Sequence, residues 1–172
     1  TMVQDRFDNA RIRLLLDLPM NHIGALASGI GLVLASGGLL VMAEKFDPGY
    51  TLASIEAQRL NVVIGVPAMM TRIVEHPDFG TTDLTSLKYM CWGAGPISER
   101  VLDRFLEGTQ ARISQQYGMT ETNGFIVYTP PPRDRDILLS TTGLPDPRLD
   151  LRITDGCDSE VRTGEEGEVQ VK

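Results

Sequence analysis

Cysteine is scarce in this sequence. Only Cys91 and Cys157 occur among 172 residues, far apart and outside any CxxC or His-rich spacing. Neither a disulfide framework nor a structural zinc site is therefore predicted. We expect Cys91, which lies in an apolar run, to be buried, and Cys157, which follows a turn, to be exposed. This cysteine usage fits a reducing cytosol, so we expect a cytoplasmic protein.

Positive charge is also sparse. The chain has 16 Lys and Arg against 23 Asp and Glu, a formal net charge of -7. Nucleic acid binding needs clustered basic residues, and none cluster here, so nucleic acid is excluded as a partner. Acidic residues gather near the C-terminus, which we interpret as a solvated edge. They are Asp150, Asp155, Asp158, Glu160, Glu165, Glu166 and Glu168.

The longest stretch without charge is interrupted. No charged residue occurs from Ile23 to Ala43, a length that raises the possibility of a transmembrane helix. Gly37-Gly38 breaks this stretch, and serine and further glycines dilute it, so we expect a buried helix followed by a buried strand and no transmembrane segment. Thr1 to Asp17 lacks the charged region and cleavage site of a signal peptide.

Short apolar runs alternate with segments of helical periodicity. With 42% hydrophobic residues, the chain is long enough to bury one full core. The pattern predicts an α/β fold with a mainly parallel sheet flanked by helices, whose ligands bind beyond the carboxyl ends of the strands. The expected strands are Leu14–Leu18, Leu39–Met42, Val62–Val66, Leu87–Trp92 and Arg112–Gln116.

Helices are expected between these strands. One is predicted from about Asn21 to Ala35, and another follows the turn at Asp47-Pro48-Gly49. Pro67 and Pro96 each suit the first turn of a helix, the second of which would end at Gly108.

The pattern changes after Pro130-Pro131-Pro132, which we interpret as a boundary between an α/β lobe (1–132) and a second subdomain (133–172). Alternating sequences around Leu151 and Val169 predict that the second part holds the first antiparallel strands of a β-barrel subdomain.

Two glycine-bearing segments are expected at strand ends: Gly93-Ala94-Gly95-Pro96 and Tyr117-Gly118-Met119-Thr120-Glu121. The second places a hydroxyl and a carboxylate beside a glycine, a combination suited to a nucleotide phosphate and its magnesium ion. The aromatic face of Tyr117 suits a base. Taken alone, the pentapeptide could equally be an ordinary polar turn.

The order of motifs resembles the adenylate-forming superfamily, the AMP-forming acyl- and aryl-CoA synthetases with luciferases and peptide-synthetase adenylation domains. The matching segments cover nearly the whole chain. They are Leu18-Pro19-Met20-Asn21-His22-Ile23-Gly24, Phe46-Asp47-Pro48, Val66-Pro67, Trp92 to Pro96, Tyr117 to Glu121, and Gly164-Glu165-Glu166-Gly167-Glu168-Val169.

The resemblance implies ATP (bound as AMP after activation), Mg²⁺ and CoA as ligands of the whole enzyme. It also implies site roles. Gly93, Ala94, Gly95 and Pro96 with Tyr117 and Gly118 would enclose adenine, Thr120 would bond the α-phosphate, Glu121 would hold magnesium, and His22 would lie at the acyl tunnel. A hydrogen-bonded structural histidine is the alternative interpretation of His22.

The substrate class follows from the same comparison. Amino-acid adenylation domains usually carry a Phe-Asp pair near the position of Asn21-His22, which here lacks an acid. An uncharged acyl or aryl carboxylic acid is therefore favoured over an amino acid, whose buried ammonium would need a carboxylate. A peptide-synthetase adenylation domain and a non-catalytic α/β binding or scaffold module are the open alternatives.

The family's lysine-bearing phosphate loop, ribose-binding aspartate and mobile C-terminal domain with its catalytic lysine have no counterpart in these residues. We therefore expect an internal fragment of a synthetase, inactive alone. Apolar surface intended for other parts would favour a homodimer.

Overall fold

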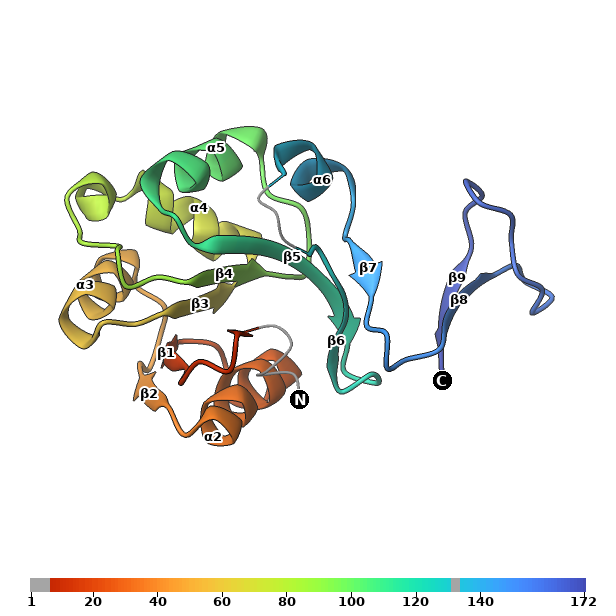
Figure 1. Cartoon of the computed structure of the whole chain (residues 1–172), viewed down its shortest axis with the longest axis horizontal. Coiled ribbons are helices and arrows are strands. Elements are labelled where there is room, and N and C mark those ends of the chain that lie inside the picture. The colour runs from red at the N-terminus through yellow and green to blue at the C-terminus, as the bar shows by residue number, and fades with distance from the viewer. Residues whose placement is uncertain (1–6, 131–133) are drawn as a thin grey trace.

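The computed structural model describes residues 7–130 and 134–172. Its main feature is a seven-stranded sheet in the order β2-β1-β3-β4-β5-β6-β7, and Figure 1 shows this sheet with helices on both faces. The first five strands run parallel to their neighbours, which confirms the predicted mainly parallel α/β sheet. They are β1 (Arg13–Leu16), β2 (Leu39–Met42), β3 (Val62–Gly65), β4 (Tyr89–Trp92) and β5 (Arg112–Met119).

Two of these strands differ from prediction in a way that shapes the site. Strand β1 ends at Leu16, which leaves Asp17 beyond the strand. Strand β5 continues to Met119 because it pairs antiparallel with β6 (Gly124–Tyr128), a strand that the sequence analysis did not predict. The Tyr117 segment therefore lies in a hairpin rather than after a strand end.

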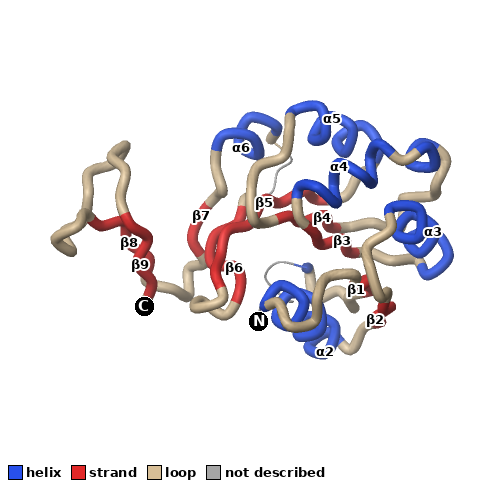
Figure 2. Tube along the Cα trace, turned by 180° about the vertical axis from the view of Figure 1, so that it is seen from behind, coloured by secondary structure: helices blue, strands red, loops and turns tan. Residues whose placement is uncertain are grey.

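Helices cover both faces of the sheet, because alternate residues of the central strands are buried on opposite sides. Val63 packs in a core cluster with α3 (Pro48–Gln58), α4 (Pro67–Glu75) and α5 (Glu99–Gly108). Val62 and Ile64 pack in a second cluster with α2 (Leu32–Ser36). Figure 2 shows α3, α4 and α5 on one side and α2 on the other.

Helix starts follow local sequence signals. The Asp47 carboxylate accepts a hydrogen bond from the Tyr50 N–H at 2.8 Å and caps α3, while Pro67 begins α4 as predicted. The prediction for Pro96 is wrong. Helix α5 begins three residues later, after Ser98, whose hydroxyl accepts a hydrogen bond from the Val101 N–H and supplies the cap that proline cannot.

The predicted helix at 21–35 is also shorter and of a different type. It consists of a π-helix, η1 (Gly24–Gly31), followed directly by α2. It ends at Gly37, whose φ of 63° is the left-handed conformation that terminates many helices. No helix among the described residues is long and apolar enough to cross a membrane.

The remaining elements connect the sheet to a C-terminal hairpin. The short 3₁₀-helix η2 (Pro77–Gly80) follows α4, and α6 (Arg135–Ser140) precedes β7 (Leu144–Pro145), which pairs with β6. Strands β8 (Leu151–Thr154) and β9 (Glu168–Val171) then form a separate antiparallel sheet, as predicted. The prolines at 131 and 132 lie outside the described residues, and the division of the chain at residue 132 stays a prediction.

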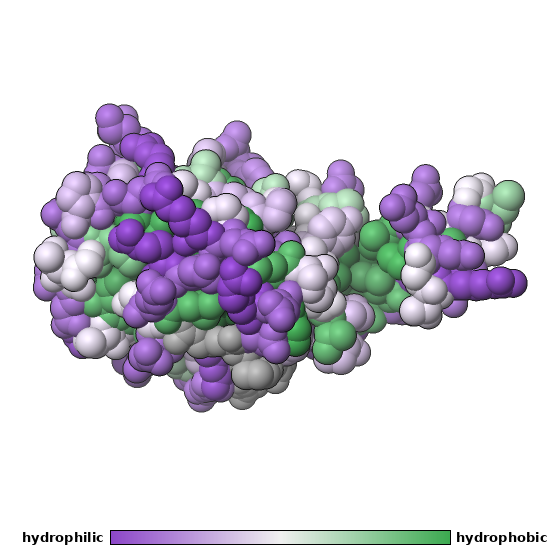
Figure 3. All heavy atoms as spheres, turned by 90° about the horizontal axis from the view of Figure 1, so that it is seen from above, coloured by the Kyte–Doolittle hydropathy of each residue, from purple (hydrophilic) through white to green (hydrophobic). Residues whose placement is uncertain are grey.

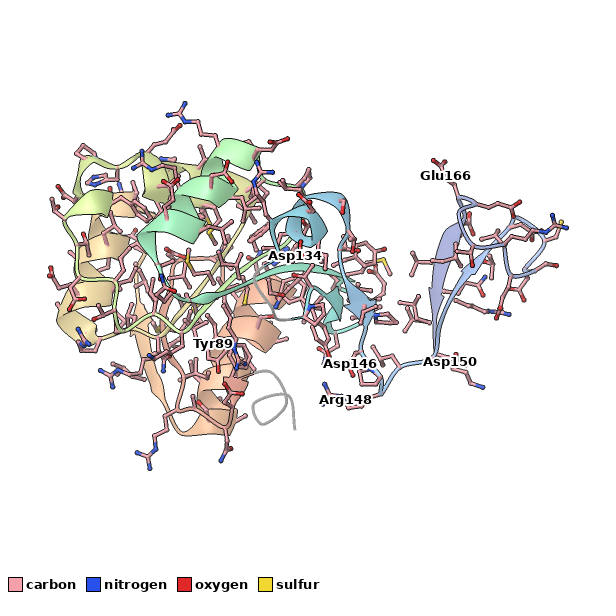
Figure 4. The ribbon with its side chains drawn as sticks, turned by 45° about the horizontal axis from the view of Figure 1, so that its top comes forward. Tyr89, Asp134, Asp146, Arg148, Asp150 and Glu166 are labelled. Atoms are coloured by element: carbon pink, nitrogen blue, oxygen red, sulfur yellow. The ribbon has the colours of Figure 1, made fainter. Side chains whose placement is uncertain are left out.

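The β8–β9 unit stands apart from the main body in Figure 1, and Figure 3 shows hydrophobic atoms on the side of it that faces the body. Before it, the Arg148 guanidinium makes two hydrogen bonds, at 2.8 and 2.6 Å, to the carboxylate of the buried Asp146. Figure 4 shows this pair at the connection and Glu166 far from it on the outer end of the unit. The acidic residues near the C-terminus are exposed, as predicted.

Candidate functional site

A cavity of about 600 Å³ lies at the carboxyl ends of β1, β3 and β4 and beside the β5–β6 hairpin. Helices η1 and α4 close its sides. Most of its wall is hydrophobic, with Phe46, Met69 and Phe125 among the contributors. This is the position at which open parallel sheets bind their ligands.

The cavity brings together residues from three of the predicted segments. His22, Gly93, Ala94, Gly118 and Thr120 all line it, although they come from three separate parts of the sequence. The other predicted site residues are near these in sequence but do not form its wall. They are Gly95, Pro96, Tyr117 and Glu121.

The loop after β4 is held tightly against the neighbouring strands. The Gly93 N–H donates to the Gly65 carbonyl at 3.3 Å, and a Cβ at Gly93 would lie 2.7 Å from the ring of Phe125. Only glycine fits there without displacing Phe125. Ala94 follows with a φ of 69°, a left-handed conformation that costs a non-glycine residue roughly 1–3 kcal/mol and is concentrated at functional sites.

The β5–β6 hairpin is fixed by a threonine that the sequence analysis did not select. The Thr122 hydroxyl accepts a hydrogen bond from the Met119 N–H at 3.0 Å and lies 2.9 Å from the Gly124 carbonyl oxygen, to which it can donate. Gly118 pairs with Phe125 across the hairpin, and the strands are so close that a Cβ at Gly118 would overlap the Gly124 carbonyl oxygen. Its motif, a glycine four residues before threonine and six before glycine, carries the signal for this tight pairing.

Thr120 and Glu121 occupy the tip of this hairpin and are both exposed. The Asn123 N–H donates to the Thr120 carbonyl at 3.0 Å. This turn bond joins two backbone groups and does not use the Thr120 hydroxyl or the Glu121 carboxylate. The described residues contain no cluster of three His, Cys, Asp or Glu side chains suited to a metal ion. A single carboxylate is nevertheless what Mg²⁺ needs when substrate phosphates and water complete its ligands, so Glu121 fits such an ion.

His22 lies at the mouth of the cavity with one ring nitrogen committed. Its Nδ1 accepts a hydrogen bond from the Gly24 N–H at 3.0 Å, at the start of η1. A nitrogen that accepts a hydrogen bond is unprotonated, so the neutral ring carries its hydrogen on Nε2. His22 thus combines a local structural bond with a second nitrogen available as a donor.

Asp17 is a carboxylate in the cavity wall that the sequence analysis missed. It follows β1, and its Oδ2 lies 3.4 Å from the Thr51 hydroxyl. Burial raises the pKa of Asp17 from 3.8 to about 6, against the opposing effects of its own backbone N–H and of Thr51. A titratable group so perturbed in a cavity is a candidate functional residue. The only signal in the sequence is that Asp17 directly follows the three leucines at 14–16.

Comparison with known proteins agrees with this arrangement. The family model described as AMP-binding enzyme matches residues 1–172. The chain is 32% identical over 162 residues to a feruloyl-CoA synthase from Amycolatopsis sp, with 92% of this chain and 32% of that protein covered. It is 30% identical over 160 residues to an indoleacetate–CoA ligase from Aromatoleum aromaticum, with 93% and 31% covered.

A solved structure of the amide bond synthetase McbA from Marinactinospora thermotolerans shares the fold, with a TM-score of 0.85 and 28% identity. The match covers 99% of this chain and 34% of that one. The chain therefore belongs to the AMP-binding enzyme family, as the resemblance of its motifs implied. It spans about a third of the length of the relatives it matches.

Proposed function

We propose that the chain is part of an AMP-forming acid–CoA ligase that activates an uncharged acyl or aryl carboxylic acid. One observation supports this most. The loop expected at adenine, the hairpin expected at phosphate and the histidine expected at the acyl tunnel line one cavity. The names of the relatives, a feruloyl-CoA synthase and an indoleacetate–CoA ligase, support the acid and CoA as substrates.

The reaction has two halves. A carboxylate oxygen of the acid attacks the α-phosphorus of ATP, and pyrophosphate leaves, which gives the acyl-adenylate. The CoA sulfur then attacks the acyl carbonyl carbon, its thiol proton is lost, and AMP leaves. In the first half-reaction the carboxylate must approach the triphosphate, which is also negatively charged. Fixed hydrogen-bond donors are therefore required where negative charge develops on the phosphate oxygens.

The residues of this chain would divide that work. Gly93 to Pro96 and Tyr117-Gly118 would flank adenine, and the Thr120 hydroxyl would donate to the α-phosphate. Because the close approach at Gly118 and the Thr122 hydrogen bond constrain the hairpin, Thr120 would be positioned before the substrate binds. His22 Nε2–H would donate into the acyl end of the cavity.

Glu121 would be a ligand of Mg²⁺. When bound, such an ion neutralises charge on the phosphate oxygens and the leaving pyrophosphate. The exposed tip of the hairpin leaves room for the water and phosphate ligands that Mg²⁺ retains.

Three further expectations belong to the same proposal. The two cysteines, Cys91 buried and Cys157 exposed, support a cytoplasmic location. Exposed apolar side chains such as Leu34 and Leu144 support association, including a homodimer. The 172-residue chain alone should be inactive, because it spans about a third of its relatives.

The test is acid-dependent exchange of labelled pyrophosphate into ATP by the complete protein that the gene encodes. Thioester formation on adding CoA follows the second half. We expect exchange only with a carboxylic acid present, and thioester only with CoA. Exchange driven by α-amino acids, with no thioester, would instead assign a peptide-synthetase domain. Absence of exchange with every acid would favour the binding or scaffold module.

A further inference from the structure

Asp17 is an anionic group in an otherwise hydrophobic part of the cavity wall. Its neighbours on the side of α3 and α4 include Leu15, Val63 and Met70, all buried. Phe46, Ile64 and Met69 line the same cavity as Asp17. A carboxylate here loses much of its hydration, which is unfavourable unless a partner compensates.

The protein supplies Asp17 with two hydrogen-bond partners, its own backbone N–H and the Thr51 hydroxyl, and the contact with Thr51 is long. The Thr51 hydroxyl is 3.4 Å from Asp17 Oδ2 but 2.9 Å from the Asp47 carbonyl oxygen. A hydroxyl has one hydrogen to donate, and the shorter contact favours Asp47. Among the residues that the structure describes, Asp17 forms no ion pair. The carboxylate therefore retains accepting capacity that points to a ligand.

The position of Asp17 in the sheet fixes which part of a ligand it can meet. It follows β1, whereas Gly118 and Thr120 belong to β5 and its hairpin, and the sheet order places β1 three strand spacings from β5. At about 4.8 Å per spacing, the lateral separation is roughly 14 Å. An acid whose carboxyl group is activated at the hairpin would present its far end to Asp17.

We propose that the Asp17 carboxylate is a specificity-determining group that accepts a hydrogen bond from an uncharged O–H or N–H at the end of the acid remote from its carboxyl group. This rests on the proposed function, because it assumes activation at Thr120. The substrate can therefore carry a polar group even though Asn21-His22 lacks the aspartate of amino-acid adenylation domains. The α-ammonium of an amino acid, one carbon from the carboxyl group, is too close to the hairpin to reach Asp17.

An uncharged donor suits the site better than a distal ammonium. A hydrogen bond from a neutral O–H to an ionised carboxylate is charge-assisted, and it needs only a small group to lose its water. A buried ion pair would require the desolvation of a second charge in a hydrophobic cavity. The ligand class is therefore an acid with a terminal hydroxyl or a ring N–H.

Matched pairs of acids test this with the complete protein. Each pair differs only in a terminal hydroxyl: 4-hydroxycinnamate with cinnamate, and 8-hydroxyoctanoate with octanoate. The readout is kcat/KM for acid-dependent exchange of pyrophosphate into ATP. We expect the hydroxylated member of at least one pair to be preferred by about tenfold or more, because a site built to bond a donor rejects the analogue without one.

The Asp17→Leu variant should abolish or reverse that preference. Asp17→Asn, which keeps side-chain size, should reduce it to a few-fold and should improve 4-methoxycinnamate relative to 4-hydroxycinnamate, since an amide can donate. Asp83→Asn, at a partly exposed aspartate outside the cavity, is the control and should leave the ratios at the wild-type value.

Equal use of both members of every pair by the wild type would overturn the inference, and this result needs no variant to fold. An unchanged ratio in Asp17→Asn and Asp17→Leu would also overturn it. Preference for 4-(aminomethyl)cinnamate over 4-hydroxycinnamate would contradict the uncharged donor. In each of these cases exchange itself occurs, so the proposed ligase function would stand. Absence of exchange with every acid would remove both proposals together.

Discussion

The Thr122 hydroxyl bridges the two strands of the β5–β6 hairpin, 3.0 Å from the Met119 N–H and 2.9 Å from the Gly124 carbonyl oxygen. Thr122 lies between the two, one residue after Glu121. The hairpin tip that presents Thr120 and Glu121 is therefore held by a side chain that faces inward. Thr122 and Gly118 thus shape the hairpin, whereas Thr120 and Glu121 are the residues that would act on the nucleotide.

The Thr122→Val substitution tests the structural role of the Thr122 hydroxyl. It keeps the shape of the side chain but leaves the Met119 N–H without its acceptor, at a cost of about 1–3 kcal/mol in the free energy of unfolding. We expect KM for ATP to rise as well, since the tip loses its fixed position. Urea denaturation and steady-state kinetics on the complete protein measure both effects. Thr122→Ser keeps the hydroxyl and is the control; equal losses in the two variants would contradict a role for the hydrogen bond.

Gly118→Ala should be more damaging than its size suggests. The added Cβ would overlap the Gly124 carbonyl oxygen, which is backbone and cannot rotate away. We expect a loss of about 1–3 kcal/mol or more in stability, the cost of overpacking a tight site. The matched control is Gly156→Ala, where a Cβ meets nothing within 4 Å. Thermal unfolding of the two variants compares them, and similar midpoints would contradict the close approach of Gly118 to the Gly124 carbonyl.

Asp17→Asn should stabilise the protein at neutral pH. The folded state raises the pKa of Asp17 to about 6, so the folded carboxyl binds its proton more tightly than the unfolded one does. Between pH 3.8 and about 6, the unfolded state is ionised and the folded state is still protonated. Stability is therefore lost as the pH rises through this window, by on the order of 1–3 kcal/mol after allowance for partial exposure.

The gain from Asp17→Asn should accordingly be full above about pH 6 and absent below pH 4. Unfolding free energies measured across that range give the profile. Asp83→Asn provides a control of opposite sign, because hydrogen bonds from Thr85 and the nearby Arg59 lower the pKa of Asp83. A gain for Asp17→Asn that did not depend on pH would show that its carboxylate is not desolvated.

Much of the fold was readable because buried parallel strands are short apolar runs. Val62 to Gly65 is buried at every position, and the run alone indicated a central strand. The π-helix at Gly24 was not predictable, since one extra residue per turn has no sequence signature. The sequence analysis does not predict β6, although Phe125 to Tyr128 is rich in β-forming residues, because it places the preceding motif after the end of a strand.

The candidate site was also only partly predictable from the sequence. Gly93 and Thr120 could be selected from local motifs, and the structure places both at one cavity. Asp17 could not, because its importance arises from α3 and α4, which bring Thr51 and Met69 beside it from distant parts of the chain. The burial of a charged side chain depends on tertiary contacts, so it cannot be predicted from the neighbouring residues in the sequence.

The most direct test of the central claim is Glu121→Gln in the complete protein. The substitution keeps size and hydrogen bonding but removes the charge proposed to bind Mg²⁺. Labelled pyrophosphate exchange into ATP, at saturating acid and limiting magnesium, should fall by about tenfold or more, while binding of the acid stays unchanged. Glu166→Gln, at an exposed glutamate on the β8–β9 unit, is the matched control and should exchange at the wild-type rate. If Glu121→Gln exchanged as fast as the wild type at limiting magnesium, Glu121 would be a residue of an ordinary turn and the assignment of the hairpin to nucleotide chemistry would be wrong.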